Sequence, residues 1–231
     1  MKPWQVSIET KDDGSSMAWA FEMPGASGQG ADENDALRDL QRTLEWLAGW
    51  RRRHHLAPIE RAGIEVAESV TATGYPNTGD TEGFFQEDAL PLTDEYAEEC
   101  VQILTFSRAD LLPIAQALPP SEKLTWTLMH IAKAEWWYAS RIPGSPGDIE
   151  QFPTTSDSRA CLRLSREMFV TRHVPYVLSV LPRERRHIAD GEEWTARKTL
   201  RRAVWHELYH LQRMEQAAGS GSGTRGTDTS P

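Results

Sequence analysis

The segment HELYH at residues 206–210 holds the side chains whose types and spacing most directly suggest chemistry. Residues four apart lie on the same face of an α-helix, so the imidazoles of His206 and His210 can reach one cation. Leu200, Ala203 and Met214 extend the same stripe at spacings of three and four. The pattern therefore predicts that both histidines face a core. The basic residues of this helix are expected on the opposite, solvated face, with an anion-binding patch as the alternative: Arg197, Lys198, Arg201 and Arg202.

The same segment matches HExxH, the motif in which two histidines bind zinc and the glutamate is the general base of a metallopeptidase. Such peptidases commonly take a third ligand from further along the chain. Here only 21 residues follow His210, and Glu215 is too close on the same helix to be that ligand. The motif is also short enough to occur by chance. The sequence therefore disfavours a peptidase.

A third ligand must then come from upstream, and His130 is the candidate. It lies on a helical stripe with Trp126, Ala134 and Trp137. A single histidine on such a stripe is more often a hydrogen-bonded core residue than a ligand. Three buried imidazoles without a common partner would be costly, and one divalent cation satisfies all three. We therefore predict a metal site of His130, His206 and His210 that leaves positions open for a reactive ligand and suits zinc or nickel.

The remaining histidines and cysteines carry weaker expectations. His173 could approach the site from another helix, although a core or surface position is the alternative. His54, His55 and His187 lie in charged stretches and are expected near solvent. Cys100 and Cys161 are expected as small buried apolar side chains. Either Trp136 or Trp137 could line a substrate pocket, with core packing as the alternative.

These residues need helices to position them, and the second half of the chain has four candidates. Helices are expected from residue 93, where Thr93 is a suitable N-cap, from about 121 to 141, from about 158 to 181 with a bend near Pro175, and from about 193 to 218. Pro113 and Pro119-Pro120 limit how far the first can run. A long crossover at 143–158 separates the second from the third. The pattern predicts an antiparallel four-helix bundle with one crossover connection.

The first half of the chain has a different pattern. Two alternating runs, at residues 4–9 and 17–22, flank Asp13-Gly14 and predict a β-hairpin. Apolar residues at helical spacing then predict a helix over 31–50. The expected organisation is a β-β-α module at 1–70, a linker or surface loop at 71–92, the bundle at 93–218 and a disordered tail at 219–231. The predicted fold class is α+β.

Composition and charge exclude several classes of protein. The 231 residues carry a net charge of −9, and residues 1–120 hold 9 basic and 21 acidic side chains against 16 and 13 in the remainder. The acidic balance argues against nucleic-acid binding. No apolar run reaches the roughly 18 residues that span a bilayer, and the first residues contain no apolar signal segment. With 2 cysteines, a disulfide framework is excluded, and a cytoplasmic protein is expected.

The blocks WTLMHIAKAEWWYASRI (126–142) and WTARKTLRRAVWHELYHLQRM (194–214) resemble the DinB/YfiT-like superfamily of metalloenzymes over about residues 95–215. The resemblance implies a four-helix bundle in which His130, His206 and His210 hold one divalent metal ion. It further implies a thiol S-transferase, which joins a low-molecular-weight thiol cosubstrate to a small electrophile, or a relative such as a thiol-dependent isomerase. Candidates for hydrogen bonding around the metal or for proton handling are Glu135, Tyr138 and Tyr209, with structural packing as the alternative for each.

Residues 4–50, with DDGSSMAWAFEMPGASGQGADENDAL at 12–37, resemble the HicB-like antitoxin fold. The resemblance implies a module that could bind a protein partner through residues 1–50, although no DNA-binding segment is evident. The alternative is an accessory or homodimerisation unit. The leading hypothesis is thus a metal-dependent enzyme acting on a small molecule. The rival hypothesis is a non-catalytic, metal-stabilised binding protein or an antitoxin-like one.

Overall fold

The computed structural model describes residues 1–153, 155–180, 182, 183 and 185–221. The fold class is α+β, as predicted. The chain forms two compact units, one of residues 1–93 with 181–205 and one of residues 94–180 with 206 onward. The units are therefore discontinuous in sequence, whereas the predicted boundaries divide the chain into consecutive ranges. Helix α7 (Ala196–Gly221) begins in the first unit and continues into the second.

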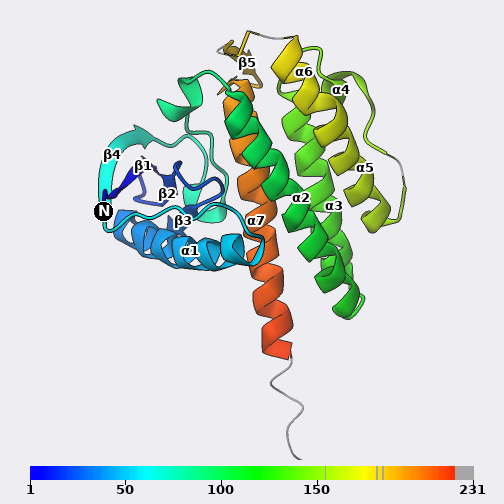
Figure 1. Cartoon of the computed structure of the whole chain (residues 1–231), viewed down its shortest axis with the longest axis horizontal. Coiled ribbons are helices and arrows are strands. Elements are labelled where there is room, and N and C mark those ends of the chain that lie inside the picture. Colours follow the sequence, from blue (N-terminus) through cyan, green and yellow to red (C-terminus); the bar gives the residue numbers. More distant parts are fainter. Residues whose placement is uncertain (154, 181, 184, 222–231) are drawn as a thin grey trace, which may run out of the picture. The chain divides into compact units, whose positions relative to one another are not determined.

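A four-stranded sheet forms the centre of the first unit (Figure 1). Its strands are β1 (Trp4–Thr10), β2 (Ser16–Ala20), β3 (Ser27–Gly30) and β4 (Ile64–Thr71), in the order β3-β2-β1-β4. β1 and β2 pair antiparallel across the turn at Gly14, whose φ is 90°, so the predicted hairpin is confirmed. β3 and β4 were not predicted, and β4 pairs parallel to β1. The module is β-β-β-α-β rather than β-β-α.

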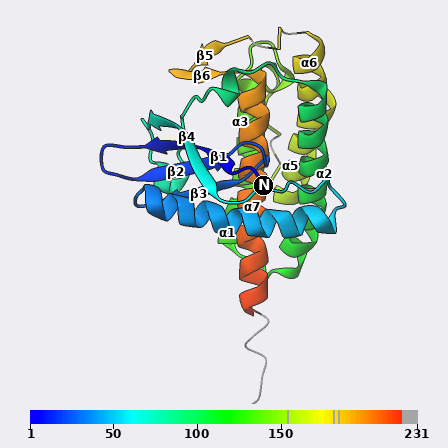
Figure 2. The same cartoon turned by 60° about the vertical axis from the view of Figure 1, so that its left-hand side comes forward.

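Helix α1 (Glu33–Arg53) covers one face of this sheet (Figure 2). The Asp32 side chain accepts a hydrogen bond from the backbone N–H of Asp35 at 2.8 Å and so caps the first turn. The predicted apolar stripe is buried, including Ala36, Leu40 and Leu47. The helix extends to Arg53, three residues beyond its predicted end at Trp50.

Strand β3 explains why a glycine-rich stretch, which the sequence suggests is a bend, forms part of the sheet. A Cβ atom at Gly28 would overlap the backbone of Leu40 and Ala36 in α1. A Cβ atom at Gly30 would likewise overlap α1, at Ala36 and Asp35. Glycine is thus required here by the close approach of helix and strand, which local strand propensity does not reveal.

Residues 71–92, expected as a linker or surface loop, pack into the first unit instead. Phe85, Leu92, Thr81 and Asp88 are buried. Two short 3-10 turns, Pro76–Thr78 and Glu87–Ala89, shape the segment. The turn-forming residues of this segment were recognised correctly from the sequence. Its buried side chains are too widely spaced along the chain to give a periodic signal.

The four basic residues of α7 are also buried, which contradicts their predicted solvated face. Arg201 donates two hydrogen bonds to the carboxylate of Asp88, at 2.7 and 2.8 Å. The Lys198 ammonium lies 2.9 Å from Glu192. Arg197 pairs with Glu87, and Arg202 donates to the carbonyl of Thr81. Acidic and carbonyl oxygens of the first unit therefore pair with each of these cations, which the helix pattern alone could not predict.

A two-stranded hairpin, β5 (His187–Ala189) and β6 (Glu192–Trp194), precedes α7. The predicted fourth helix was therefore wrong at its start, since Glu193 belongs to a strand. Asp190 and Gly191 both have positive φ, 54° and 83°, in the connecting turn. An Asp-Gly pair between short runs is a hairpin signal, and it was present in the sequence.

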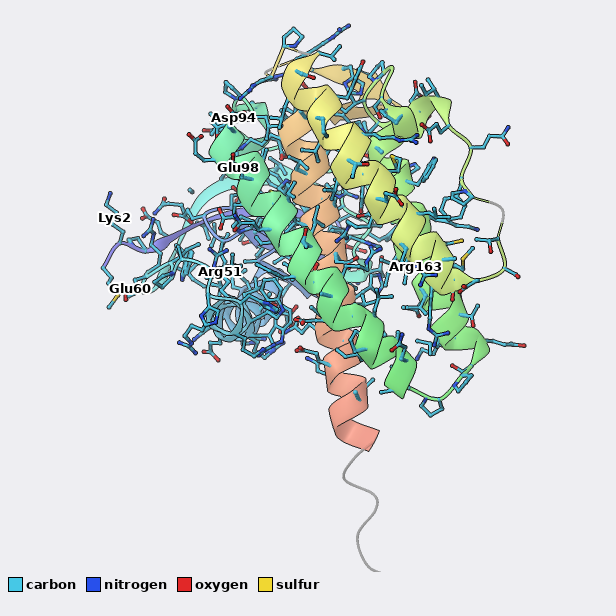
Figure 3. The ribbon with its side chains drawn as sticks, turned by 45° about the vertical axis from the view of Figure 1, so that its right-hand side comes forward. Lys2, Arg51, Glu60, Asp94, Glu98 and Arg163 are labelled. Carbon is cyan, nitrogen blue, oxygen red and sulfur yellow. The ribbon has the colours of Figure 1, made fainter. Side chains whose placement is uncertain are left out.

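The second unit is helical. It contains α2 (Asp94–Ala117), α3 (Glu122–Ser140), α4 (Pro146–Ile149), α5 (Ser158–Met168) and α6 (Val174–Ser179), with α7 from residue 206. Ser121 caps α3 as predicted, since its Oγ accepts the N–H of Leu124 at 3.1 Å. α2 continues through Pro113 and ends before Pro119-Pro120. Figure 3 labels Glu98 on α2 and Arg163 on α5, both exposed.

A π-helical segment, Phe169–His173, joins α5 to α6 just before Pro175. The N–H of Val174 donates to the carbonyl of Phe169, five residues earlier. Proline has no N–H and its ring crowds the carbonyl four residues before it, so the regular ladder cannot continue there. The predicted bend near Pro175 thus corresponds to a change of helix type.

α7 extends to Gly221, so the tail predicted as disordered from 219 begins within the helix. The rest of that prediction, for residues 222–231, lies outside the described residues. Among the helices that the structure describes, none combines the length and apolar character needed to cross a bilayer.

Candidate metal centre

The three predicted ligands come together in the second unit. His130 lies in α3, and His206 and His210 lie on one face of α7. The Nε2 atom of His206 is 2.9 Å from Nε2 of His130 and 3.3 Å from Nε2 of His210. Within the described part of the chain, these three residues form the group of donors able to hold a metal ion, with one ligand atom from each within 4.8 Å of the others.

The donor set suits a divalent cation. Three imidazoles present the same ring nitrogen to one region, although a neutral imidazole has only one N–H to share. Two nitrogens bound to a tetrahedral zinc ion at 2.0–2.1 Å would lie about 3.3 Å apart. The observed separations of 2.9 and 3.3 Å are close to this value. The site can therefore accept an ion with small side-chain adjustments.

Burial favours the neutral form of two of these imidazoles, those of His130 and His210. Desolvation lowers the pKa of His130 below its ordinary value. The pKa of His210 falls to about 4, mainly because of desolvation and then because of the charge of His130, which the nearby Glu207 partly offsets. A neutral imidazole has a free lone pair, which is the form that binds a metal. At neutral pH these two side chains are ready to act as ligands.

Aromatic rings hold the histidines in place. The indole of Trp126 stacks on His130, with centroids 5.0 Å apart and planes 5° from parallel. Tyr138 meets His206 edge-on at 6.0 Å, and Tyr209 meets His210 almost perpendicularly at 5.3 Å. Of the predicted hydrogen-bonding candidates, these two tyrosines therefore contact the ligands through their rings. Such contacts restrict the imidazole orientations.

Glu207, the glutamate of HELYH, is occupied by two arginines. Arg108 donates to its carboxylate from Nε at 2.7 Å and from Nη2 at 2.9 Å. Arg166 Nη2 lies 3.4 Å from the same group. Burial alone would raise the pKa of Glu207, but these two positive charges outweigh it and hold the pKa below its ordinary value. A buried carboxylate clamped in this way is a poor general base.

Glu135, the third predicted candidate, belongs to the same cluster. It accepts hydrogen bonds from Arg166 Nε at 2.5 Å, Ser165 Oγ at 2.8 Å and Arg108 Nη2 at 3.3 Å. Its side chain is 5% exposed. Glu135 thus neither reaches the histidines nor faces solvent, and its partners occupy it fully.

Sequence reasoning missed Arg108 and Arg166, although a signal existed. Arg108 follows Leu104 at helical spacing and precedes Leu111 on the buried stripe of α2. Arg166 occupies the corresponding place between Leu162 and Phe169. A charged residue on an otherwise apolar stripe is rarely buried alone. Two such positions could have predicted partners for the buried glutamates.

His173 is not part of the metal site. It is fully buried, and its Nδ1 lies 3.1 Å from Ser145 Oγ. Ser145 uses its only hydroxyl proton on the carbonyl of Ala139, so His173 must donate through Nδ1–H. The core position given as the alternative is therefore the observed one. Cys100 and Cys161 are buried as expected.

A shallow hollow of about 600 Å³ lies along α3, and none of the three histidines lines it. Trp126, Met129 and Lys133 line it, and residues 120–122 and 125 complete it. The indole of Trp126 is 65% exposed although its ring stacks on His130. Trp136 lines a different hollow, of about 230 Å³, with Glu150 and Arg172.

Comparison of the chain with protein-family models, with curated proteins and with solved structures finds no match.

Proposed function

We propose that this chain binds one divalent metal ion through His130, His206 and His210. The observation that carries the proposal is the convergence of three Nε2 atoms, 2.9 and 3.3 Å apart along the cluster. Zinc and nickel both suit three imidazoles with open positions, because nitrogen ligands are favourable to each.

We further propose an enzyme of the DinB/YfiT-like type built on a four-helix bundle with a crossover between its second and third helices. The resemblance of residues 126–142 and 194–214 to that superfamily supports this assignment. So does the pairing of one histidine on α3 with two on α7 in HxxxH spacing. The proposed activity is the transfer of a low-molecular-weight thiol to a small electrophile.

A bound divalent ion supplies one kind of chemistry here, since it lowers the pKa of a coordinating thiol and favours the nucleophilic thiolate. In the overall transfer, the sulfur forms a bond to an electrophilic carbon and the thiol proton passes to solvent. The leaving group departs with the electron pair of the broken bond. The protein's own contribution is to orient three imidazoles and to hold the carboxylates of Glu207 and Glu135 in pairs with arginines.

The hollow along α3, lined in part by the Trp126 ring that stacks on His130, supports a small-molecule substrate. Trp126 and Met129 offer apolar contact area, and Lys133 offers a positive charge. Lys133 forms no ion pair with any residue that the structure describes. An electrophile with a flat apolar body and one negative group would suit these three side chains.

Metal analysis of the purified protein tests the proposal most directly. We expect close to one equivalent of zinc or nickel per chain, and its loss in His130→Ala and His206→Ala. His187→Ala, which changes a histidine of the first unit, is the matched control and should retain the metal. A substoichiometric metal content in the wild-type protein, or unchanged content in the two site variants, would refute the metal site.

Cobalt substitution tests the transferase activity separately. Cobalt(II) in a three-histidine site gives a visible spectrum that changes when a thiolate binds. We expect millimolar low-molecular-weight thiols to shift this spectrum in the wild-type protein. A spectrum indifferent to every small thiol would remove the support for thiol transfer and leave the metal site intact.

The rival proposal is a non-catalytic protein in which the metal stabilises the helices and residues 1–50 bind a protein partner, as in a HicB-like antitoxin. The observation that favours it is the compact first unit, whose sheet and α1 contain none of the three histidines. Co-purification of a stoichiometric partner that depends on residues 1–50 would support it. A peptidase is the weakest alternative because both arginines occupy Glu207.

A further inference from the structure

We infer that a buried cluster of two arginines and two glutamates, which does not touch the metal position, holds the three histidines in metal-binding geometry. The cluster consists of Arg108, Glu135, Arg166 and Glu207, and it is called the Arg/Glu cluster below. The inference rests on the proposed metal site, and it assigns the four residues as positioning residues rather than catalytic ones.

Arg108 links the two helices that supply the ligands. From α2, its guanidinium donates to Glu207 of α7 at 2.7 and 2.9 Å and to Glu135 of α3 at 3.3 Å. Glu207 directly follows His206, and Glu135 lies little more than one turn beyond His130 on a rigid helix. The position of α3 against α7 sets the 2.9 Å separation between His130 and His206. Arg108 therefore fixes the relationship on which that separation depends.

Arg166 makes a second, independent connection from α5. It donates to Glu135 at 2.5 Å and lies 3.4 Å from Glu207. Each arginine is itself anchored to a backbone carbonyl, Arg108 to Leu162 and Arg166 to Leu104. Planar guanidinium groups held at several points resist both sliding and rotation of the helices that they join.

The cluster also decides which groups can reach the ion. A buried ion pair gives little net stability compared with apolar side chains of similar size, so stability alone does not account for four buried charges. With both carboxylates held by arginines, imidazole nitrogens form the donor group. Freeing one carboxylate beside α7 would offer the ion a competing oxygen ligand and would remove a constraint on His206.

Cobalt(II) binding to the full chain tests this inference. Arg108→Met removes one of the two arginine connections between α3 and α7, leaves that of Arg166 in place and retains much of the side-chain volume. We expect its cobalt affinity to fall by about 10–100-fold, the usual effect of losing a residue that orients metal ligands. Its visible spectrum should also change in position or intensity, because a distorted or altered ligand set changes the coordination geometry. A loss of stability alone would not move that spectrum.

Arg201→Met is the matched control. Arg201 also lies on α7, is buried, and donates two hydrogen bonds to a buried carboxylate, Asp88, at 2.7 and 2.8 Å. It is equally an arginine–carboxylate pair, but its acceptor belongs to the first unit. We expect Arg201→Met to lower the melting temperature while the cobalt affinity and spectrum stay as in the wild-type protein.

Ser165→Ala keeps the test decisive if Arg108→Met does not fold. This change removes one 2.8 Å hydrogen bond to Glu135 and leaves every charge in place. We expect a smaller loss of cobalt affinity, about 2–5-fold, in a folded protein. Wild-type affinity and spectrum in folded Arg108→Met, or in Ser165→Ala when the former is unfolded, would overturn the inference. A wild-type protein that binds no cobalt would instead overturn the proposed metal site.

Discussion

The Nε2 atoms of His130 and His206 lie 2.9 Å apart, although the two residues are 76 positions apart in the chain. Two neutral imidazoles at this distance can share a single proton, but the third nitrogen, from His210, lies only 3.3 Å from His206. One N–H between two rings leaves the third ring without an equivalent partner. A cation bound by all three lone pairs would remove this conflict, so we expect the stability of the second unit to depend on the proposed metal.

Removing the metal should therefore lower the melting temperature. A ligand present at 1,000 times its dissociation constant stabilises the folded state by about 4 kcal/mol. For a protein of this size, such a loss corresponds to a shift of roughly 10 °C. Differential scanning fluorimetry with and without a chelator measures it. His206→Ala should melt at one temperature under both conditions, and a wild-type protein insensitive to chelation would contradict this expectation.

Trp126 should contribute to metal affinity through its stack on His130. An aromatic pair contributes about 0.5–1.5 kcal/mol beyond burial, so Trp126→Ala should weaken cobalt binding by roughly 2–10-fold. Trp137→Ala is the control, since Trp137 is a second exposed tryptophan of α3 and contacts Tyr138 and Arg141 instead. Equal effects of both substitutions on a cobalt titration would show that the stack is unimportant.

Acid should destabilise the protein through His173. Burial lowers the pKa of His173 to about 3, whereas the unfolded chain protonates near its ordinary value of 6.5. Unfolding therefore takes up a proton between these pH values, and stability falls as the pH falls. Between pH 7 and pH 5 this single residue should cost about 2 kcal/mol.

Urea unfolding of wild-type protein and His173→Phe, at pH 7 and pH 5, isolates this contribution. The variant should lose about 2 kcal/mol less over the interval. The other histidines titrate alike in both proteins and cancel. Loss of the hydrogen bond to Ser145 should lower the stability of the variant at both pH values by about 1 kcal/mol. Parallel pH profiles for the two proteins would show that His173 is not responsible.

Gly28→Ala should destabilise the first unit. The added methyl group would overlap the backbone of Leu40 and Ala36, so strand β3 and helix α1 would have to separate. Overpacking of this kind costs about 1–3 kcal/mol. Gly49→Ala is the control, because it lies within α1 and its Cβ would meet nothing closer than 4.0 Å. Alanine there should be neutral or stabilising in the same urea assay.

The candidate site was predictable because its signals are local. Spacings of three and four place His206 and His210 on one face. His130 is the third candidate ligand as predicted, but its stripe is not the core face of α3, since Trp126 is 65% and Trp137 38% exposed. These patterns depend on the geometry of a single helix, which neighbouring residues determine. The α1 stripe and the first hairpin were predictable for the same reason, since an Asp-Gly turn and short apolar periods are properties of adjacent residues.

Apart from the β5–β6 hairpin, whose Asp190-Gly191 signal is local, the missed features depend on contacts between residues distant in sequence. β4 pairs with β1 across some sixty residues and in parallel, so no hairpin signal precedes it. Lys198 and Arg201 were predicted to face solvent because their ion-pair partners, Glu192 and Asp88, could not be identified from helical spacing. Arg108 and Glu207 are 99 positions apart. Buried charge pairing of this kind follows from tertiary structure rather than from helical period.

The course of α7 limits how this chain could be divided or recombined. The unit that contains the metal ligands takes two of them from a helix whose first part, up to Trp205, belongs to the other unit. A gene fragment ending at residue 93 would omit strands β5 and β6 and the buried cations that follow them. A fragment starting at residue 94 would contain α7 but would lack Glu87 and Asp88, the partners of Arg197 and Arg201. A single cut in the chain therefore cannot separate the two units.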